Sequence, residues 1–282
     1  MDVEIRHLRT TEEFEACERL QRRVWAMPDD RGVVPLHLLL SAQRNGGLVL
    51  GAFVGDTLAG FLFGYPGLTT NGRLKHCSHM MGVAPELQSR GVGYRLKLVQ
   101  REFALGQGCD LVTWTYDPLE SRNAFLNVHK LGGVCRTYIR DFYGPMDDKL
   151  NRGLPSDRFE VEWWIASEHV KRRLVSGDGG ELDKTELARL VSEREVRPGN
   201  ILVGEGPPRV WMEIPADYQA IRASDPALAA EWRVASRRVL EEQLEKGYVI
   251  SDLACPAVPG ARRCFYLLSK AGEKGDDARR AD

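Results

Sequence analysis

The sequence has no excess of basic residues, since 39 Lys and Arg stand against 40 Asp and Glu among 282 residues. Nucleic-acid binding depends mostly on neutralisation of phosphates by basic side chains, so a near-neutral chain without a basic block argues against a nucleic-acid partner. No apolar run approaches the length that crosses a membrane, and the acidic first residues, 1–4, lack the apolar core of a signal peptide. These absences predict a cytoplasmic protein with no membrane partner.

Patterns typical of metal sites and disulfide frameworks are also lacking. The six cysteines contain no C-x-x-C pair, and most lie in apolar runs, where a reduced cysteine behaves as a small hydrophobic side chain. They are Cys17, Cys77, Cys109, Cys135, Cys255 and Cys264. The six histidines are scattered without the spacing of zinc ligands. We therefore expect no disulfide and no metal, and we expect most histidines to be structural.

The most informative segment that is present covers residues 83–96, VAPELQSRGVGYRL, where an apolar run passes through glycines into an amphipathic helix. Gly91 and Gly93 lack the Cβ atoms that would keep a ligand from the main chain, so successive N–H groups can converge on one anion. A Walker loop would need Lys and then Ser or Thr where Tyr94 and Arg95 stand, and a dinucleotide fingerprint would need glycine in place of Leu96. The segment predicts a phosphate-bearing ligand, with an ordinary strand-to-helix turn as the alternative.

The residues on either side have the hydrophobic periods of a helix and a strand. Apolar residues recur at positions 92, 96, 99 and 103, while the basic residues, Lys97 among them, take other faces of the helix. Residues 74–83 predict a long buried strand, although positions 76–79 are His, Cys, Ser and His. Polar side chains inside such a strand need partners or a function.

The remaining pattern predicts alternating strands and helices. The capping box of Thr10 and Glu13 opens the first helix, and residues 117–120 supply an N-cap, a proline and a capping-box glutamate for a later one. In order, the predicted elements are a strand at 3–5, a helix from 10, a short helix at 35–45, strands at 48–53, 58–64 and 74–83, a helix from 92, a strand at 111–116, a helix from 117 and a strand at 134–143.

This order, together with Gln88-x-x-Gly91-x-Gly93 after a strand, resembles the GNAT superfamily of acyl-CoA N-acyltransferases over about residues 3–166, with 159–165 as the last strand. The resemblance implies a mixed α/β fold, a central mixed sheet flanked by helices, and acyl-CoA as co-substrate. It implies that pantetheine lies between the strand ending near Val83 and the strand from Leu111, with main-chain N–H groups facing the thioester. The cofactor-binding residues implied are Met81, Val83, Gln88, Ser89, Arg90, Gly91, Val92, Gly93, Tyr94, Ser121 and Asn123.

The catalytic groups match this family unevenly. Where the family often has an Asn and a general-acid Tyr, this sequence has Ser121 and Val128. Transfer remains feasible, because a thiol with a pKa of about 8.5 can leave as the thiolate. Asn123, Asn127 and His129 are further candidates for assisting that step.

A base must also take a proton from the amine acceptor. The candidate catalytic residues are His79, Tyr116 and Glu120, with Asp117 beside them. The structural alternatives are a satisfied core histidine for His79 and helix caps for Asp117 and Glu120.

Phrases such as 117–123, DPLESRN, and 151–158, NRGLPSDR, look like one bacterial GNAT subgroup, which is similar to the amino-acid N-succinyltransferases that accompany N-succinylamino acid racemases. A succinyl group and an amino acid each carry a carboxylate, which guanidinium groups bind well. We expect Arg122, Arg152 and Arg158 to bind substrate, the last two foremost. The alternative is that most arginines of this region, Arg136 and Arg140 included, are solvated or ion-paired.

The composition changes after residue 166. We predict an acyltransferase core at 1–166, a linker and connecting segment at 167–208, a smaller C-terminal α+β extension at 209–269 and a disordered tail at 270–282. The extension could cover the acceptor site, complete the sheet or form a homodimer interface, with Trp232, Arg233 and Arg237 as contributors. No internal repeat is evident in the sequence.

Two classes of function follow. One is an enzyme that transfers an acyl group from acyl-CoA to a small-molecule amine, either succinyl from succinyl-CoA to an amino acid or acetyl from acetyl-CoA to a small amine. The other is a CoA-binding module without catalysis, which Val128 at the general-acid position favours.

Overall fold

The structure is a computed structural model that describes residues 2–27, 29–144, 153–176, 187, 191, 197–203, 209–258 and 261–270. Its described residues fall into two compact units, an N-terminal unit of residues 2–114 with residue 153 and a C-terminal unit of residues 115–144 and 154–270. Both units combine strands and helices, so the expected mixed α/β class is confirmed. The predicted boundaries at 166 and 208 stay predictions, and most of the predicted tail lies outside the described residues.

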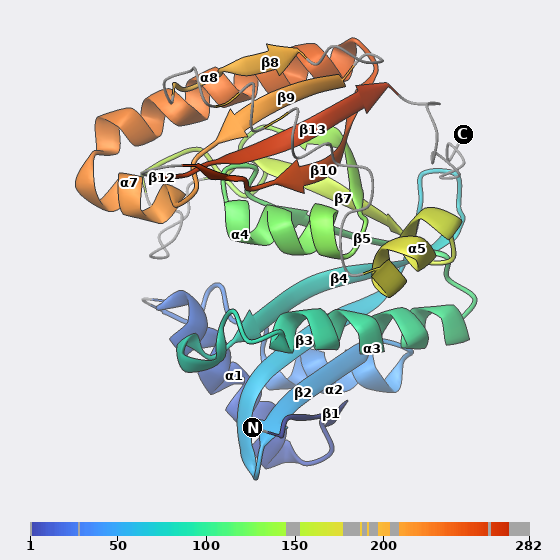
Figure 1. Ribbon diagram of the computed structural model, residues 1–282. Helices are drawn as coiled ribbons and strands as arrows, with labels where there is room; N and C mark the ends of the chain where they lie inside the picture. Colours follow the sequence, from blue (N-terminus) through green and yellow to red (C-terminus); the bar gives the residue numbers. More distant parts are fainter. Residues whose placement is uncertain are drawn as a thin grey trace. The chain divides into compact units, whose positions relative to one another are not determined.

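The N-terminal unit is built on one sheet (Figure 1). Four strands, β1 (Glu4–His7), β2 (Leu48–Val54), β3 (Thr57–Leu68) and β4 (Leu74–Val83), follow one another in antiparallel order. The fifth, β5 (Leu111–Tyr116), runs parallel to β4 and continues into the C-terminal unit. The sequence predicted β4 and β5 with these same bounds.

Helices cover both faces of this sheet (Figure 1). On one face lie α1 (Thr11–Trp25) and α2 (Leu36–Arg44), and on the other lies α3 (Val92–Gly106), preceded by a 3₁₀ turn at Pro85–Leu87. The N-terminus of α1 carries the predicted cap, because the Thr10 hydroxyl accepts a hydrogen bond from the Glu13 amide at 3.4 Å. Each helix therefore begins near its sequence signal.

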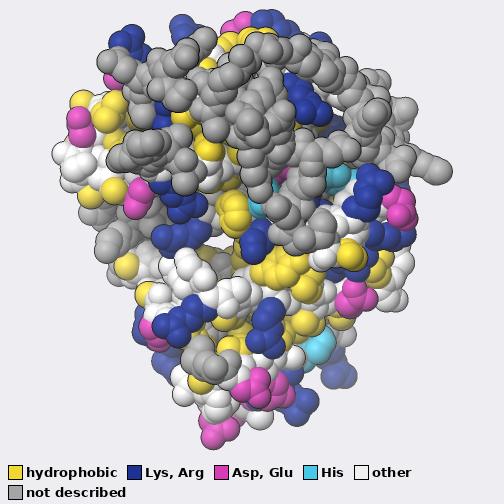
Figure 2. All heavy atoms as spheres, in the orientation of Figure 1, with side chains coloured by type: hydrophobic (Ala, Val, Ile, Leu, Met, Phe, Trp, Pro, Cys, Tyr) yellow, Lys and Arg dark blue, Asp and Glu magenta, His cyan; other side chains and the backbone are white. Residues whose placement is uncertain are grey.

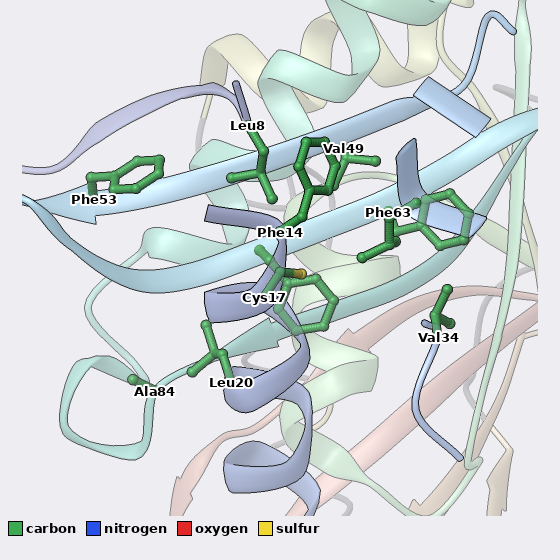
Figure 3. Close-up of a cluster of buried hydrophobic side chains, with 11 residues drawn as sticks. Leu8, Phe14, Cys17, Leu20, Val34, Val49, Phe53, Phe63 and Ala84 are labelled. Atoms are coloured by element: carbon green, nitrogen blue, oxygen red, sulfur yellow. The ribbon is translucent and has the colours of Figure 1, made fainter. Parts of the chain in front are cut away.

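Strands β2 and β3 are buried on both faces, and alternate side chains enter two separate cores. Figure 3 shows the first core, where Phe14, Cys17 and Leu20 of α1 pack against Val49 and other strand side chains. Under α3, the second core contains Leu48, Leu50, Ala52, Leu62, Val92 and Leu96. This two-sided burial fixes α3, and hence the glycine-rich segment before it, against the sheet.

The C-terminal unit also has one main sheet, with strand order β7-β6-β10-β13-β9-β8. Its strands are β6 (Val134–Ile139), β7 (Arg158–Trp164), β8 (Ile201–Val203), β9 (Arg209–Ile214), β10 (Tyr248–Ala254) and β13 (Cys264–Lys270), with a small hairpin of β11 (Ala257–Val258) and β12 (Ala261–Arg262). Strand β10 of the extension pairs with β6 through Ile250 and Cys135. The extension therefore completes the sheet that begins with β6 and β7.

The helices of this unit differ from expectation at one point. The helix predicted from 117 begins as α4 (Ser121–Ala124) and continues as a π-helix (Phe125–Lys130), because Asp117 instead holds a turn by accepting the Leu119 amide at 2.9 Å. The other helices are α5 (Glu168–Ser176), α7 (Tyr218–Ser224) and α8 (Pro226–Glu245), and α8 packs on β6 and β10.

The order strand, helix, strand, strand occurs twice in this part of the chain. The first set is β5, α4 with the π-helix, β6 and β7, and the second is β9, α7 with α8, β10 and β13. In each set the last two strands pair antiparallel. This repeat is not evident in the sequence, because the two sets share an order of elements rather than a motif.

The expectation of no disulfide is wrong. Cys255 and Cys264 form a disulfide with Cα atoms 4.2 Å apart. Ala254 of β10 pairs with Phe265 of β13, so the two cysteines are the next residues in register on adjacent strands. Sequence spacing alone did not reveal a pairing that the strand register imposes.

Charged side chains of both signs are interspersed on the face drawn in Figure 2, in keeping with the balanced composition. None of the helices in the described ranges combines the length and the apolar character needed to cross a bilayer. Within those ranges, no group of three or more His, Cys, Asp or Glu is arranged to hold a metal ion.

Candidate functional site

The glycine-rich segment forms an open N-terminus for α3. Gly91 is the N-cap residue with a φ of +81°, a left-handed conformation that favours glycine, and no side chain caps this end of the helix. The first turn of α3 contains no acidic residue, so the positive end of its dipole is not offset there. By contrast, α1, α7 and α8 each have a side-chain cap. The first N–H groups of α3 are therefore available to an anion.

The rest of this segment is ordered and exposed. Gln88 donates from Nε2 to the Val83 carbonyl at 3.1 Å, which ties the loop to the end of β4. Ser89 has a φ of +62°, which is uncommon for a residue other than glycine and is a position of backbone strain. Gln88, Ser89, Arg90 and Gly91 are all exposed, while Gly93 and Tyr94 are half-buried. The cofactor-binding residues predicted from the loop therefore lie on one turn whose exposed part is 88–91, whereas Val92, also predicted, is buried in the second core.

The strand that leads into this loop separates from its neighbour. In the described residues β4 and β5 pair at two positions, His76 with Val112 and Cys77 with Thr113. Met81 and Val83, both predicted to contact the cofactor, lie farther along β4 and are half-buried. A stretch of β4 main chain thus continues beyond the paired positions toward the loop.

His79, a candidate base, lies on β4 next to two aromatic rings. Its ring centroid is 5.6 Å from that of Phe63 and 5.9 Å from that of Tyr65. Loss of solvation lowers the pKa of His79 below its ordinary value of 6.5, although the residue is exposed at the surface. The imidazole is therefore neutral at pH 7 and able to accept a proton.

A buried lysine lies where β4 and β5 cease to pair, and the prediction that Lys97 faces away from the core is wrong. Lys97 is 2% exposed, and its Nζ donates to Ser78 Oγ at 2.8 Å and to Gln100 Oε1 at 3.2 Å. Its Nζ also lies 3.5 Å from the centroid of the Trp114 ring. Burial lowers the pKa of Lys97 well below its ordinary value. Burial, with a further contribution from Lys97, lowers the pKa of His76 to about 4.

Tyr116, another candidate, is fully enclosed in the C-terminal unit. Its hydroxyl lies 3.0 Å from that of Tyr266, which donates to the Pro118 carbonyl at 2.8 Å. Burial raises the pKa of Tyr116 well above its ordinary value. These contacts fit a positioning role for Tyr116 at the end of β5.

The residues after Tyr116 form a charged cluster, which we call the Asp117 cluster: Asp117, Arg158 and Arg233. Arg233 Nη2 donates to Asp117 Oδ2 at 2.5 Å, and Arg158 Nη1 lies 3.9 Å from the same oxygen. Arg158 and Arg233 are both buried, on β7 and α8 respectively. Two guanidinium groups therefore share one carboxylate just beyond β5.

A second carboxylate next to this cluster, that of Asp157, accepts several hydrogen bonds. Asp157 accepts two hydrogen bonds from Arg237, at 2.8 and 2.7 Å, one from the Tyr138 hydroxyl at 2.6 Å and one from the Asp141 amide at 3.0 Å. Although burial opposes it, this set of donors lowers the pKa of Asp157 below its ordinary value. The hydrogen bonds of the Asp157 carboxylate are therefore made mainly with Arg237 and Tyr138.

The remaining predicted site residues differ in burial and in hydrogen-bond partners. Glu120 accepts a hydrogen bond from Gln219, and burial, followed by the charge of Asp117, raises its pKa. Ser121 is buried and donates to the Ala216 carbonyl at 2.7 Å, whereas Arg122 and Asn123 are exposed on α4. Arg152 lies outside the described residues, and Val128 is buried in the π-helix. These roles stay predictions.

Sequence reasoning missed Lys97 and gave Arg233 only a minor place. The sequence did contain a hint that Lys97 is buried. Leu96, Gln100 and Ala104 follow the helical period of the buried face of α3, and two of them are not large apolar residues, so this face is not made of apolar side chains alone. Arg233 had no such signal, because its partner Asp117 is 116 residues away in the sequence.

Comparison with protein-family models gives no match for this chain, and comparison with curated proteins gives none either. Solved structures do match. The chain is similar to the ribosomal-protein-S18-alanine N-acetyltransferase from Escherichia coli, with 18% identity, 58% of this chain and 94% of that chain covered, and a TM-score of 0.46. It is similar to an acetyltransferase of the GNAT family from Streptococcus pneumoniae, with 15% identity, 57% and 98% coverage and a TM-score of 0.47. For an N-acetyltransferase from Staphylococcus aureus the identity is 13%, the coverage 58% and 99%, and the TM-score 0.48.

Proposed function

We propose that this chain is an acyl-CoA-dependent N-acyltransferase of the GNAT type that acylates the amine of a small molecule. The observation that carries the proposal is the uncapped N-terminus of α3, reached through Gln88-x-x-Gly91-x-Gly93 with Gly91 in a left-handed conformation. Such an N-terminus suits a pyrophosphate, because unpaired N–H groups and the helix dipole both favour negative charge. The sequence resemblance of this loop to that of the GNAT superfamily supports the same ligand.

The rest of the mechanism follows from β4. Main-chain N–H groups along its last residues would face the thioester and stabilise the oxyanion formed when the amine attacks. His79 supports proton removal from that amine, because its lowered pKa leaves the imidazole neutral at pH 7. The thiolate can leave without a tyrosine acid, since a thiol of this kind has a pKa of about 8.5.

For the substrates, we propose succinyl transfer from succinyl-CoA to an amino acid, with acetyl transfer from acetyl-CoA to a small amine as the alternative. The buried guanidinium of Arg158 supports a carboxylate-bearing substrate. A CoA-binding module without catalysis is the second candidate function, because buried Val128 offers no acid at that position of the helix after β5.

The loop assignment is tested by Gly91→Val. An added Cβ at Gly91 meets nothing within 4 Å, so the substitution displaces no neighbour, yet a β-branched residue is strained at a φ of +81° and would obstruct an anion. Calorimetric titration with CoA should show binding by the native chain and little or none by the variant. Gly108→Val is the matched control, because Gly108 also has a positive φ, of +76°, and open space around it, and this variant should bind CoA normally. Equal CoA affinity in Gly91→Val would refute the assignment.

Turnover separates the candidate functions. Release of CoA thiol is followed with succinyl-CoA and with acetyl-CoA, each with and without a pool of amino acids. Release that requires succinyl-CoA and an amino acid supports the proposed activity, whereas release with acetyl-CoA only supports the alternative. Tight CoA binding without release under either condition supports the non-catalytic module.

A further inference from the structure

Arg233 is a buried cation with hydrogen-bond donors that lack acceptors. The residue is 2% exposed, and its Nη2 atom donates a hydrogen bond to Asp117. Its Nε and Nη1 atoms are buried and have no hydrogen-bond partner among the residues that the structure describes. A buried N–H group without an acceptor is costly, and more so when it belongs to a charged group.

The surroundings keep Arg233 charged. Burial opposes its charge, but Asp117, with smaller contributions from Tyr218 and Tyr138, raises the pKa of Arg233 above its ordinary value. The ring of Tyr218 lies 5.3 Å from the guanidinium carbon, and its hydroxyl donates to the Ala229 carbonyl at 3.1 Å. In the described part of the chain, neither the Tyr218 hydroxyl nor Asp117 accepts a hydrogen bond from Nε or Nη1 of Arg233.

The nearby carboxylates are also committed. Asp157 is held by Arg237 and Tyr138, and Asp117 already faces a second buried guanidinium, that of Arg158. Asp117, Glu120 and Gln219 are half-buried, so solvent reaches the carboxylate side of the cluster. An anion that reached Arg233 would find a positive charge and unused donors together.

We propose that Arg233, with Arg158 beside it, binds a carboxylate of the substrate, so that the C-terminal extension supplies a binding residue of the acyltransferase. The proposal rests on the proposed function for the identity of the substrate, but the anion site itself is defined by the Asp117 cluster. A carboxylate fits because it brings one negative charge and acceptors for N–H donors. It can belong to the acyl group or to the amine acceptor.

The site is tested by calorimetric titration of the full chain with succinate and with succinamide, its neutral counterpart. We expect the native chain to bind succinate more tightly than succinamide. Arg233→Gln should weaken succinate binding at least about tenfold, the usual effect of losing a hydrogen bond to a charged group. Arg238→Gln removes an exposed cation from the same helix and should leave succinate affinity unchanged.

Arg233→Gln also leaves Asp117 without its closest partner, so Arg233→Lys provides a second variant. Lysine keeps the charge beside Asp117 but removes the Nε and Nη1 donors, and succinate binding should fall severalfold while the thermal midpoint stays near the native value. Equal affinity of the native chain for succinate and succinamide overturns the proposal. So does succinate affinity that is the same in the native chain and in whichever Arg233 variant folds.

Two further titrations identify the source of the carboxylate. If it belongs to the acyl group, Arg233→Lys should bind succinyl-CoA more weakly than the native chain does but acetyl-CoA equally well. If it belongs to the acceptor, both acyl-CoA affinities should be unchanged and the loss should appear for amino acids titrated in the presence of CoA. If Arg233→Lys loses affinity neither for succinyl-CoA nor for amino acids, a role of Arg233 in substrate binding is contradicted.

Failure of the proposed function gives a different pattern. A chain that binds CoA through the Gly91 loop but shows no Arg233-dependent succinate binding retains the proposed function and loses this inference. A chain that binds succinate through Arg233 but does not bind CoA retains the anion site and loses the proposed function.

Discussion

Lys97 provides the sharpest test of the N-terminal unit. Its ammonium has no carboxylate among its described partners, which are a serine hydroxyl, an amide oxygen and an indole ring. Burial lowers its pKa well below the ordinary value of 10.5. When unfolding returns the side chain to water, the unfolded chain binds more protons than the folded one at any pH between these two pKa values. Folding stability contributed by this residue must therefore rise with pH across that window.

The magnitude follows from proton linkage. One proton taken up on unfolding changes the free energy of unfolding by about 1.4 kcal/mol per pH unit, which is the upper limit for one group. Lys97→Met removes this slope while filling similar space. The variant also leaves Ser78 Oγ and Gln100 Oε1 without their donor, at a cost of about 1–3 kcal/mol each if they stay unpaired, but that cost does not vary with pH.

The assay is urea denaturation of the native chain and of Lys97→Met at pH 7, 8 and 9. The free energy of unfolding of the native chain minus that of the variant should increase with pH, by up to about 1.4 kcal/mol for each unit. Lys171→Met is the control, since Lys171 is exposed on α5 and pairs there with exposed Glu168, which stays ionised from pH 7 to pH 9, and its curve should stay parallel to the native one. A native-minus-Lys97→Met difference that is constant from pH 7 to pH 9 would refute the reasoning.

Two further predictions concern ion pairs. Arg263→Met should lower the free energy of unfolding, measured by urea denaturation, by about 3–5 kcal/mol. The reason is that the buried Glu213 carboxylate loses its two hydrogen bonds of 2.6 Å from Arg263. A loss below about 1 kcal/mol would contradict this and would mean that water reaches the carboxylate. Hydrogen bonds from Arg6, with further ones from the Arg9 and Thr10 backbone, lower the pKa of Glu13 from 4.5 to about 2, so the stability that ionised Glu13 contributes is present above pH 4.5 and is lost as the pH falls through 2. At pH 7, Arg6→Met should cost no more than about 1 kcal/mol, because both side chains are partly exposed, and the difference between the two stability curves should narrow as the pH falls from 4.5 to 2; a difference that stays constant over this range would contradict this.

The parts of the fold that follow local rules were predictable from sequence. The Thr10 cap, the bounds of β4 and the turn at Gly91 depend on side chains within a few residues of one another, and each has a recognisable pattern. The helix predicted from Asp117 begins four residues later, at Ser121, while Asp117 accepts the Leu119 amide in a turn and pairs with Arg233. The local signal therefore predicted the helix but misplaced its first residue.

Long-range features were not predictable in the same way. The disulfide of Cys255 depends on strand register, and the pairing of β6 with β10 depends on which edges meet. The burial of Lys97 was misjudged because lysine is rarely enclosed, and its contacts with Ser78, Gln100 and Trp114 make that burial tolerable. For the candidate site, the loop was therefore predictable, whereas the Asp117 cluster was not.

Pairing, rather than burial alone, separates structural charges from candidate binding groups in this chain. Arg173 is buried and donates to Asp252 at 2.8 Å and to the His129 carbonyl at 3.1 Å, so its charge and donors are used in joining α5 to β10. Arg263 is likewise matched to Glu213 through two short hydrogen bonds. Among the buried arginines of the described residues, Arg233 keeps N–H groups without an acceptor. A purely structural arginine would gain by pairing those groups, so their availability is best explained by an anion that binds there during function.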